Sequence, residues 1–170
     1  MHKQNKLLPW LWFAIALLIV LFDQWTKVLV NTQLDYGHRE VLTSFFNITL
    51  RYNYGVAFSL FDNIEGGQRW PLSALAFVVS LVLCVWIYRT GSQKVSFEVT
   101  GLALVLGGAI GNLYDRVTLG YVVDFIEVHY QSYYWPAFNI ADSAICIGAG
   151  LLLYDGLFSK NAKVLDSKDK

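Results

Sequence analysis

Four long apolar runs constrain this chain more than any other feature of its sequence. They cover about residues 10–30, 70–88, 97–113 and 138–158, and 55% of all residues are hydrophobic. A helix of about 20 apolar residues crosses a hydrocarbon core of about 30 Å, and it satisfies its own backbone in lipid. The runs therefore predict a membrane α-helical protein with four transmembrane helices, in a single membrane-embedded domain of residues 1–170.

The first run has some features of a secretory signal. A short basic segment, MHKQNK, precedes the apolar residues Trp10 to Phe22. No small-x-small cleavage site follows, and apolar residues resume at Val28. We therefore expect this run to remain in the protein as its first transmembrane helix.

Two charged residues, Asp23 and Lys27, lie near the outer end of this first helix. Their spacing of i and i+4 places them on one helix face. The spacing favours an intrahelical ion pair at the membrane interface, which is a structural role. A direct catalytic role for Asp23 is the alternative.

The segment of about residues 31–69 has a different pattern from the apolar runs. A period-two series rich in β-forming residues runs from Phe46 to Leu60, and Asn53-Tyr54-Gly55 interrupts it as a turn or bulge. This pattern predicts a small extracytoplasmic β-sheet between the first and second helices. The sheet should lie on the membrane surface, because an open sheet edge cannot span lipid. Asn53 is either a turn former or a polar group aimed at a peptide.

Basic residues are concentrated at one set of helix ends. Lys3 and Lys6 precede the first run, Arg89 and Lys94 lie between the second and third, and four more lysines lie in the tail of about residues 159–170. The positive-inside rule predicts that both termini are cytoplasmic and that the sheet faces the outside. We expect the polar tail to be flexible.

The segment from Gly107 to Asp142 holds a dense set of polar groups in a chain that is only 15% charged. Asp124 and Asp142 each lie at the border of an apolar run. Ionisable groups near hydrocarbon are costly and usually mark a functional site. Two carboxylates that meet there can share a proton and activate water. The two residues are therefore the candidate catalytic pair, suited to hydrolysis of an amide.

Further polar residues flank this pair. Asn112, Asp115 and Arg116 share one face if the third helix continues through them, and Asn139 can form hydrogen bonds beside Asp142. Arg116 can pair with Asp115 or with a more distant carboxylate, and it can also hold a peptide carbonyl or a lipid head group. The sequence leaves these options open.

Several classes of function find no support in the sequence. The formal net charge is zero and no basic stripe is present, so we expect no nucleic-acid partner. Cys84 and Cys146 lie inside apolar runs and are interpreted as packing residues. No Ser-His or Cys-His arrangement and no spacing typical of metal ligands is evident. We therefore expect neither a metal nor a cofactor.

Two functions of other classes compete with the hydrolase. One is a small transporter or proton channel, because intramembrane carboxylates also serve as proton relays. The other is a non-enzymatic assembly or lipid-binding protein that uses Arg116 for head groups. The polar groups gather at one membrane face rather than through the midplane, which argues against a transporter.

Five short blocks of sequence carry a family resemblance. They are Asp23-Gln24-x-Thr26-Lys27, Asn53-x-Gly55-x-Ala57-Phe58-Ser59, Gly107-Gly108-x-x-Gly111-Asn112-x-x-Asp115-Arg116, Val123-Asp124-Phe125 and Phe138-Asn139-x-Ala141-Asp142. Each block alone is weak, but all five occur in order at the right ends of the four apolar runs. Together they resemble the lipoprotein signal peptidases, or signal peptidase II, a family of bacterial inner-membrane aspartic peptidases.

The resemblance implies an endopeptidase that removes the signal peptide from diacylglyceryl-modified prolipoproteins, on the amino side of the lipidated cysteine. Asp124 and Asp142 resemble the family's catalytic pair. The residues expected to line the site and hold substrate are Asn53, Asn112, Arg116 and Asn139. The residues expected to have structural roles are Asp23, Lys27, Asp115 and Gly108.

The resemblance also implies a place in the cell and a set of partners. We expect a monomeric protein of the bacterial inner membrane, with its active site on the periplasmic side. Its partners are expected to be lipid-modified prolipoproteins and membrane phospholipids. Two residues depart from the family pattern: Val56 stands where Ala is common, and Tyr52 where Arg is common. These departures should alter how the sheet grips the peptide and leave the acid pair untouched.

Overall fold

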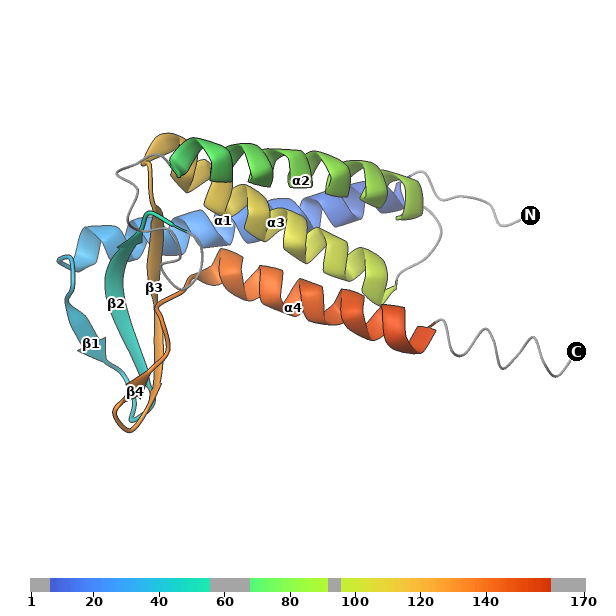
Figure 1. Cartoon of the computed structure of the whole chain (residues 1–170). Helices are drawn as coiled ribbons and strands as arrows, with labels where there is room; N and C mark the ends of the chain where they lie inside the picture. Colours follow the sequence, from blue (N-terminus) through green and yellow to red (C-terminus); the bar gives the residue numbers. More distant parts are fainter. Residues whose placement is uncertain (1–6, 56–67, 92–95, 160–170) are drawn as a thin grey trace, which may run out of the picture.

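The computed structural model describes residues 7–55, 68–91 and 96–159 (Figure 1). Its four long helices are α1 (Leu8–Gln33), α2 (Arg69–Thr90), α3 (Phe97–Thr118) and α4 (Ile140–Tyr154), and α4 continues as the π-helical turn η2 (Asp155–Ser159). All four are long and apolar enough to cross a membrane. The predicted four-helix membrane fold is confirmed. The polar tail from residue 160 onward lies outside the described residues.

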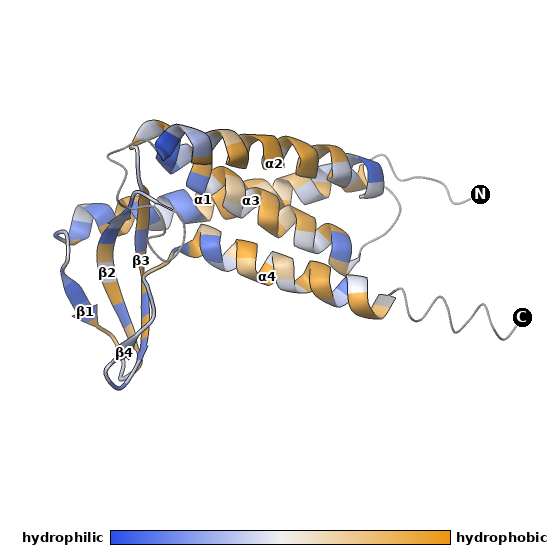
Figure 2. Ribbon diagram, in the orientation of Figure 1, coloured by the Kyte–Doolittle hydropathy of each residue, from blue (hydrophilic) through white to orange (hydrophobic). Residues whose placement is uncertain are grey.

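Helix α3 is the centre of the bundle, and it packs against α1, α2 and α4. Half of its apolar span is buried, whereas the other three spans are mostly exposed and apolar on their outer faces. Figure 2 shows hydrophobic residues along the helices and hydrophilic residues gathered near their ends and in the sheet. This distribution is the one expected of helices that face lipid.

Glycines allow α3 and α4 to approach closely. A Cβ built on Gly108 would meet the carbonyl oxygen of Ala141 and, at 2.7 Å, the side chain of Ile145. Gly101 and Gly148 face each other across the same interface, where each would meet the other's carbonyl oxygen at 2.7 Å. The structural role expected for Gly108 is therefore consistent with its position, because any side chain there would push the two helices apart.

The predicted sheet is present, and it is larger than the sequence indicated. Its strands are β1 (Arg39–Val41), β2 (Phe46–Asn53), β3 (Val122–Tyr130) and β4 (Tyr133–Tyr134), all antiparallel in the order β1-β2-β3-β4. Only β1 and β2 come from the segment between α1 and α2. The other two strands come from the connection between α3 and α4. Residues 56–60, the last part of the alternating pattern, lie outside the described residues.

A bulge in β3 determines which side chains face the helices. The backbone N–H groups of Phe125 and Ile126 both donate to the carbonyl oxygen of Phe138, at 2.9 and 2.8 Å. The extra residue changes the alternation of the strand, so that Asp124 and Glu127 both line the same cavity. An unbulged strand would turn these two carboxylates to opposite faces.

The sheet lies across one end of the helix bundle (Figure 1). Helix α1 ends there, α2 begins there, and α3 and α4 are joined there through β3. The start of α1 and the end of α4 lie at the opposite end of the bundle. This arrangement brings the polar residues of α1, α3, α4 and the sheet to a single location.

Candidate active site

Asn139 joins the two candidate catalytic acids. Its side-chain Nδ2 donates to Oδ1 of Asp124 at 2.7 Å, and its backbone N–H donates to Oδ2 of Asp142 at 3.3 Å. Asp124 lies on β3 and Asp142 in the first turn of α4. The two carboxylates, 18 positions apart in the sequence, therefore share one neighbour in space.

The local sequence explains why α4 begins at this point. Asn139 is the N-cap of α4, and its Oδ1 accepts a hydrogen bond from the backbone N–H of Asp142 at 2.8 Å. Together with the bond from the Asn139 backbone to Asp142, this forms a capping box. A carboxylate in the first turn of a helix is also stabilised by the helix dipole. Both features stabilise a carboxylate at this position.

Asn112 reaches Asp142 from α3. Its Nδ2 donates to Oδ1 of Asp142 at 2.7 Å, while its Oδ1 accepts from Lys27 at 3.0 Å and from Asn139 at 3.2 Å. Helix α3 runs to Thr118, five residues beyond the predicted end at about 113, and so includes Asp115 and Arg116. The longer helix carries Asn112, Asp115 and Arg116 on one continuous element.

Asn53, at the end of β2, is a turn former that also contacts the acid pair. Its Oδ1 accepts the backbone N–H of Gly55 at 3.0 Å, as a turn former does. Its Nδ2 donates to Oδ2 of Asp124 at 3.0 Å. Oδ1 of Asp124 therefore accepts from the amide of Asn139, and Oδ2 accepts from the amide of Asn53.

The environment of Asp124 favours its protonated form. The residue is only 3% exposed. Burial raises the pKa of Asp124 from an ordinary value of 3.8 to about 7, and the nearby charge of Asp142 acts in the same direction. Hydrogen bonds from Asn53 and Asn139 and the charge of Lys27 oppose this rise without cancelling it. Asp124 can therefore hold a proton near neutral pH.

Arg116 turns away from its neighbour Asp115. Its Nη2 donates to the carbonyl oxygen of Gly55 at 3.0 Å, and its Nη1 donates to the carbonyl oxygen of Asn112 at 3.4 Å. Its Nε is buried and has no hydrogen-bond partner among residues 7–55, 68–91 and 96–159. The guanidinium lines the cavity described below. Of the options left open by the sequence, the ion pair with Asp115 is wrong.

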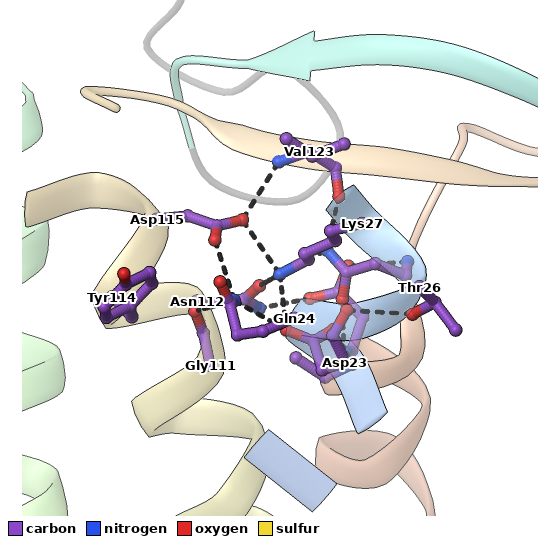
Figure 3. Close-up of polar contacts among 12 residues, drawn as sticks. Asp23, Gln24, Thr26, Lys27, Gly111, Asn112, Tyr114, Asp115 and Val123 are labelled. Carbon is purple, nitrogen blue, oxygen red and sulfur yellow. Dashed lines mark hydrogen bonds and ion pairs between the residues drawn. The ribbon is translucent and has the colours of Figure 1, made fainter. Parts of the chain in front are cut away.

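Asp115 pairs instead with Lys27, in a buried cluster that also holds Asp23 (Figure 3). The Lys27 ammonium lies 2.7 Å from Asp23 and 2.9 Å from Asp115. The predicted i,i+4 pair of Asp23 and Lys27 is confirmed, and the pair is buried within the helix bundle. Both side chains are at most 2% exposed, because α3 and α4 cover them.

A cavity of about 990 Å³ opens beside the acid pair. The polar side chains that line it include Asn53, Asn112, Arg116, Asp124 and Asp142. Its walls are aromatic on the sheet side and apolar between the helices, with Tyr36, Tyr52, Tyr54, Ala76, Ala109 and Ile145 among them. Such a mixture of apolar walls and a few convergent polar groups is typical of a ligand site.

Two residues at this cavity were missed or misread from the sequence. Cys146 is exposed and lines the cavity, so its interpretation as a packing residue is wrong, whereas Cys84 does pack against the core.

Glu127 also lines the cavity, and no role was predicted for it. Arg39 holds its Oε1 at 2.8 Å and Asn47 its Oε2 at 2.9 Å. Burial alone raises the pKa of Glu127, but these two partners outweigh burial and the net pKa is lowered.

Gln24 is a further residue that sequence reasoning passed over. Its Nε2 donates to Oδ1 of Asp115 at 2.8 Å and to the carbonyl oxygen of Gly111 at 3.2 Å. The available signal was its place beside Asp23 in the first sequence block, three positions before Lys27. All three then fall on the side of α1 that meets α3.

Comparisons with known proteins agree with this arrangement. A family model described as signal peptidase (SPase) II matches residues 15–158. The chain is 56% identical to the lipoprotein signal peptidase of Teredinibacter turnerae, over 99% of this chain and 100% of that protein. It is 51% identical to the lipoprotein signal peptidase of Cellvibrio japonicus, over 86% of this chain and 85% of that protein.

Solved structures show the same fold. A bacterial membrane enzyme determined at 2.3 Å matches with a TM-score of 0.81 and 30% identity, over 96% of each chain. A second, determined at 1.9 Å, matches with a TM-score of 0.79 and 32% identity, over 93% of this chain and 98% of that one. With four membrane-spanning helices and a membrane-enzyme fold, the chain is a multi-pass membrane protein. It is a peptidase, and it belongs to the signal peptidase II family.

Proposed function

We propose that this chain is an aspartic endopeptidase that removes the signal peptide from diacylglyceryl-modified prolipoproteins, cleaving on the amino side of the lipidated cysteine. The observation that carries the aspartic mechanism is the junction of Asp124 and Asp142 through Asn139 at the edge of a cavity. The names of the relatives support the substrate class.

The two acids divide the chemistry between them. Asp142 is ionised and takes a proton from water, whose oxygen attacks the scissile carbonyl carbon. Asp124 is protonated, consistent with its pKa of about 7, and gives its proton to the carbonyl oxygen. When the tetrahedral diol collapses, the carbon–nitrogen bond breaks. The proton on Asp142 passes to the leaving amino group of the cysteine, and Asp124 regains a proton from the diol.

The remaining predicted site residues hold the substrate and form hydrogen bonds with the two acids. Asn53 and Asn139 donate to Asp124, and Asn112 donates to Asp142. Arg116 lines the cavity, and its Nη1 and Nη2 each donate one N–H to the backbone, so the second N–H of each nitrogen can donate to a peptide carbonyl. The apolar wall formed by Ala76, Ala109 and Ile145 accommodates apolar signal peptide or acyl chains.

The reaction needs no metal and no cofactor. This proposal is supported by the donor set, because no three His, Cys, Asp or Glu side chains in the described ranges converge to hold a metal ion. One chain supplies all of the proposed site residues, so the proposed enzyme is a monomer. Its proposed partners are prolipoprotein substrates and membrane phospholipids. Neither a transporter nor a lipid-binding protein is favoured by any specific feature, since the polar groups gather at the sheet end of the bundle.

We place the protein in the bacterial inner membrane, with both termini cytoplasmic and the active site on the periplasmic side. The lysine bias of the sequence supports this orientation, as does the position of the sheet opposite the start of α1. Reporter fusions after Arg89 and Lys160 should report cytoplasm, and fusions near Asp62 and Gln131 should report the outside. The reverse pattern would contradict the orientation.

The proposed activity is tested with purified protein and a diacylglyceryl-modified precursor. We expect two products, one of which begins with the lipidated cysteine when its mass is measured. The matched precursor without the lipid should be cleaved far more slowly, and Asp124→Asn should leave the lipidated precursor intact. Cleavage at another peptide bond, or equal cleavage of both precursors, would overturn the proposed specificity.

A further inference from the structure

Lys27 is a buried residue of α1 that contacts three side chains at once (Figure 3). Its Nζ lies 2.7 Å from Oδ2 of Asp23, 2.9 Å from Oδ2 of Asp115 and 3.0 Å from Oδ1 of Asn112. Its side chain is only 2% exposed. An ammonium group has three donors, so these contacts use its full capacity.

Two of these partners bind the backbone next to the acid pair. Asp115 Oδ2 accepts the N–H of Val123 at 3.2 Å, and the next residue of β3 is Asp124. Asp23 Oδ1 accepts the N–H of Ala141 at 2.8 Å, and the next residue of α4 is Asp142. Lys27 bridges these two carboxylates. One ammonium therefore links the two backbone segments that carry Asp124 and Asp142.

The third partner, Asn112, contacts Asp142 directly. Because the ammonium can only donate, it favours the orientation in which Asn112 turns Oδ1 toward Lys27. Nδ2 is then free to donate to Oδ1 of Asp142, at 2.7 Å. The opposite amide orientation would place Nδ2 against the ammonium and remove a donor from Asp142. Lys27 thus selects the orientation that supports an ionised Asp142.

We propose that Lys27 is a positioning residue for peptide cleavage: through Asp23, Asp115 and Asn112 it sets the relative position of Asp124 and Asp142 and keeps Asn112 donating to Asp142. The inference rests on the proposed function of this acid pair. It differs from an ion pair that only stabilises the fold, because it makes the rate and pH dependence of catalysis depend on Lys27.

The charge of Lys27 also acts on the pair. It is among the influences that lower the pKa of Asp124, against the stronger effect of burial. The other charged groups that face the site are Asp23 on α1, Asp115 and Arg116 on α3, Asp142 on α4, Arg51 on β2 and Glu127 on β3, and Arg39 on β1 is paired with Glu127. These groups are unchanged when Lys27 alone is replaced, so a shift of the pH profile can be assigned to Lys27 and the contacts it makes.

The test compares Lys27→Met with wild type by the initial rates of cleavage of a lipidated precursor in detergent, per folded enzyme. We expect kcat to fall by about tenfold to a hundredfold, since small displacements of catalytic groups are this costly. KM should change by less than about twofold, because Lys27 does not line the cavity. The high-pH limb of the profile should move to higher pH, because Asp124 loses a favourable positive charge. Lys27→Arg, which keeps the charge, should restore the position of this limb and part of kcat.

Two controls separate positioning from stability. Ile87→Ala removes a fully buried core side chain near the far end of α2, so it should lower the melting temperature without moving the pH profile. In an Asn112→Ala background, Lys27→Met should cost less in kcat than it does in wild type, because one of its routes to Asp142 is already lost. If Lys27→Met alone does not fold, the same readouts are taken from Lys27→Met/Asp115→Asn, which removes one charge of each sign.

The inference is overturned if folded Lys27→Met keeps the wild-type kcat and pH profile, or if its defect matches that of Ile87→Ala. Its failure can be told apart from failure of the proposed function. An inactive Asp142→Asn together with a fully active Lys27→Met would reject positioning and keep the acid pair. An active Asp142→Asn would reject the acid pair itself.

Discussion

Asp23 on α1 and Asp115 on α3 make the same kind of contact beside the two candidate catalytic acids. Asp23 accepts a hydrogen bond at 2.8 Å from the backbone N–H of Ala141, the residue before Asp142. Asp115 accepts one at 3.2 Å from the backbone N–H of Val123, the residue before Asp124. The geometry of the acid pair therefore depends on buried charges in two transmembrane helices. This dependence explains why polar residues persist in apolar runs where burial would otherwise be costly.

Replacement of Asp124 by Asn should stabilise the protein at alkaline pH. Because the pKa of Asp124 is raised from 3.8 to about 7, the folded state keeps a proton that the unfolded chain has lost between these values. The stability of wild type therefore falls as the pH rises through this window, and an uncharged amide at this position avoids that loss. We expect Asp124→Asn to be more stable than wild type at pH 8 by on the order of 1–3 kcal/mol. The advantage should disappear near pH 4. Thermal unfolding in detergent measures both values, and an advantage that is independent of pH would contradict the raised pKa.

The pH dependence of cleavage should fall on its alkaline side as the shared proton is lost. With the pKa of Asp124 at about 7, kcat/KM should begin to decline near neutrality. The limb belongs to the coupled pair rather than to one residue. The measurement is the initial rate of cleavage across pH 5 to 9 with enzyme that stays folded throughout. A constant rate from pH 6 to 9 would be incompatible with a protonated acid in the mechanism.

Arg116→Lys should reduce activity even though it keeps the positive charge. An ammonium carries all of its donors on one nitrogen, so it cannot reproduce the planar fork whose two separate nitrogens reach Gly55 and Asn112. We expect kcat/KM to fall by about tenfold, and further in Arg116→Ala, with the melting temperature as the check on folding. Full activity in Arg116→Ala would show that Arg116 does not hold substrate.

Gly108→Ala should disturb the site through helix packing. The new Cβ would collide with the carbonyl oxygen of Ala141, which precedes Asp142, so α3 and α4 must separate. We expect a loss of about 1–3 kcal/mol in stability together with a loss of cleavage. Gly150→Ala on α4 is the matched control, because a Cβ there meets no neighbouring side chain of the described residues. Equal behaviour of the two variants would mean that close packing at Gly108 does not support the site.

The sequence predicted the helices well, and it also identified polar residues that the structure brings together, because both leave strong local signals. Long apolar runs define the helices, and isolated polar residues such as Asp142 and Asn112 stand out within them. The N-cap position of Asn139 is likewise readable, from Asn three positions before Asp at the start of an apolar run.

Other features were missed because they depend on tertiary structure. The strands β3 and β4 belong to a sheet whose other strands come from a segment about 80 positions earlier, and no local pattern predicts that pairing. The bulge at Phe125 and Ile126, which turns Glu127 to the cavity, arises from contact with Phe138. The burial of Lys27 and its contact with Asp115 were not predicted, because the helices that cover Lys27 are distant in the sequence.

The most direct test of this account is the single-turnover cleavage of a lipidated precursor by Asp142→Asn, beside Asp124→Asn and wild type. Each variant should lose at least about a thousandfold in rate, because neither acid can replace the other, while both still insert and bind precursor. Chelators should leave the wild-type rate unchanged. Substantial turnover by Asp142→Asn, or activity that EDTA abolishes and zinc restores, would contradict the acid pair.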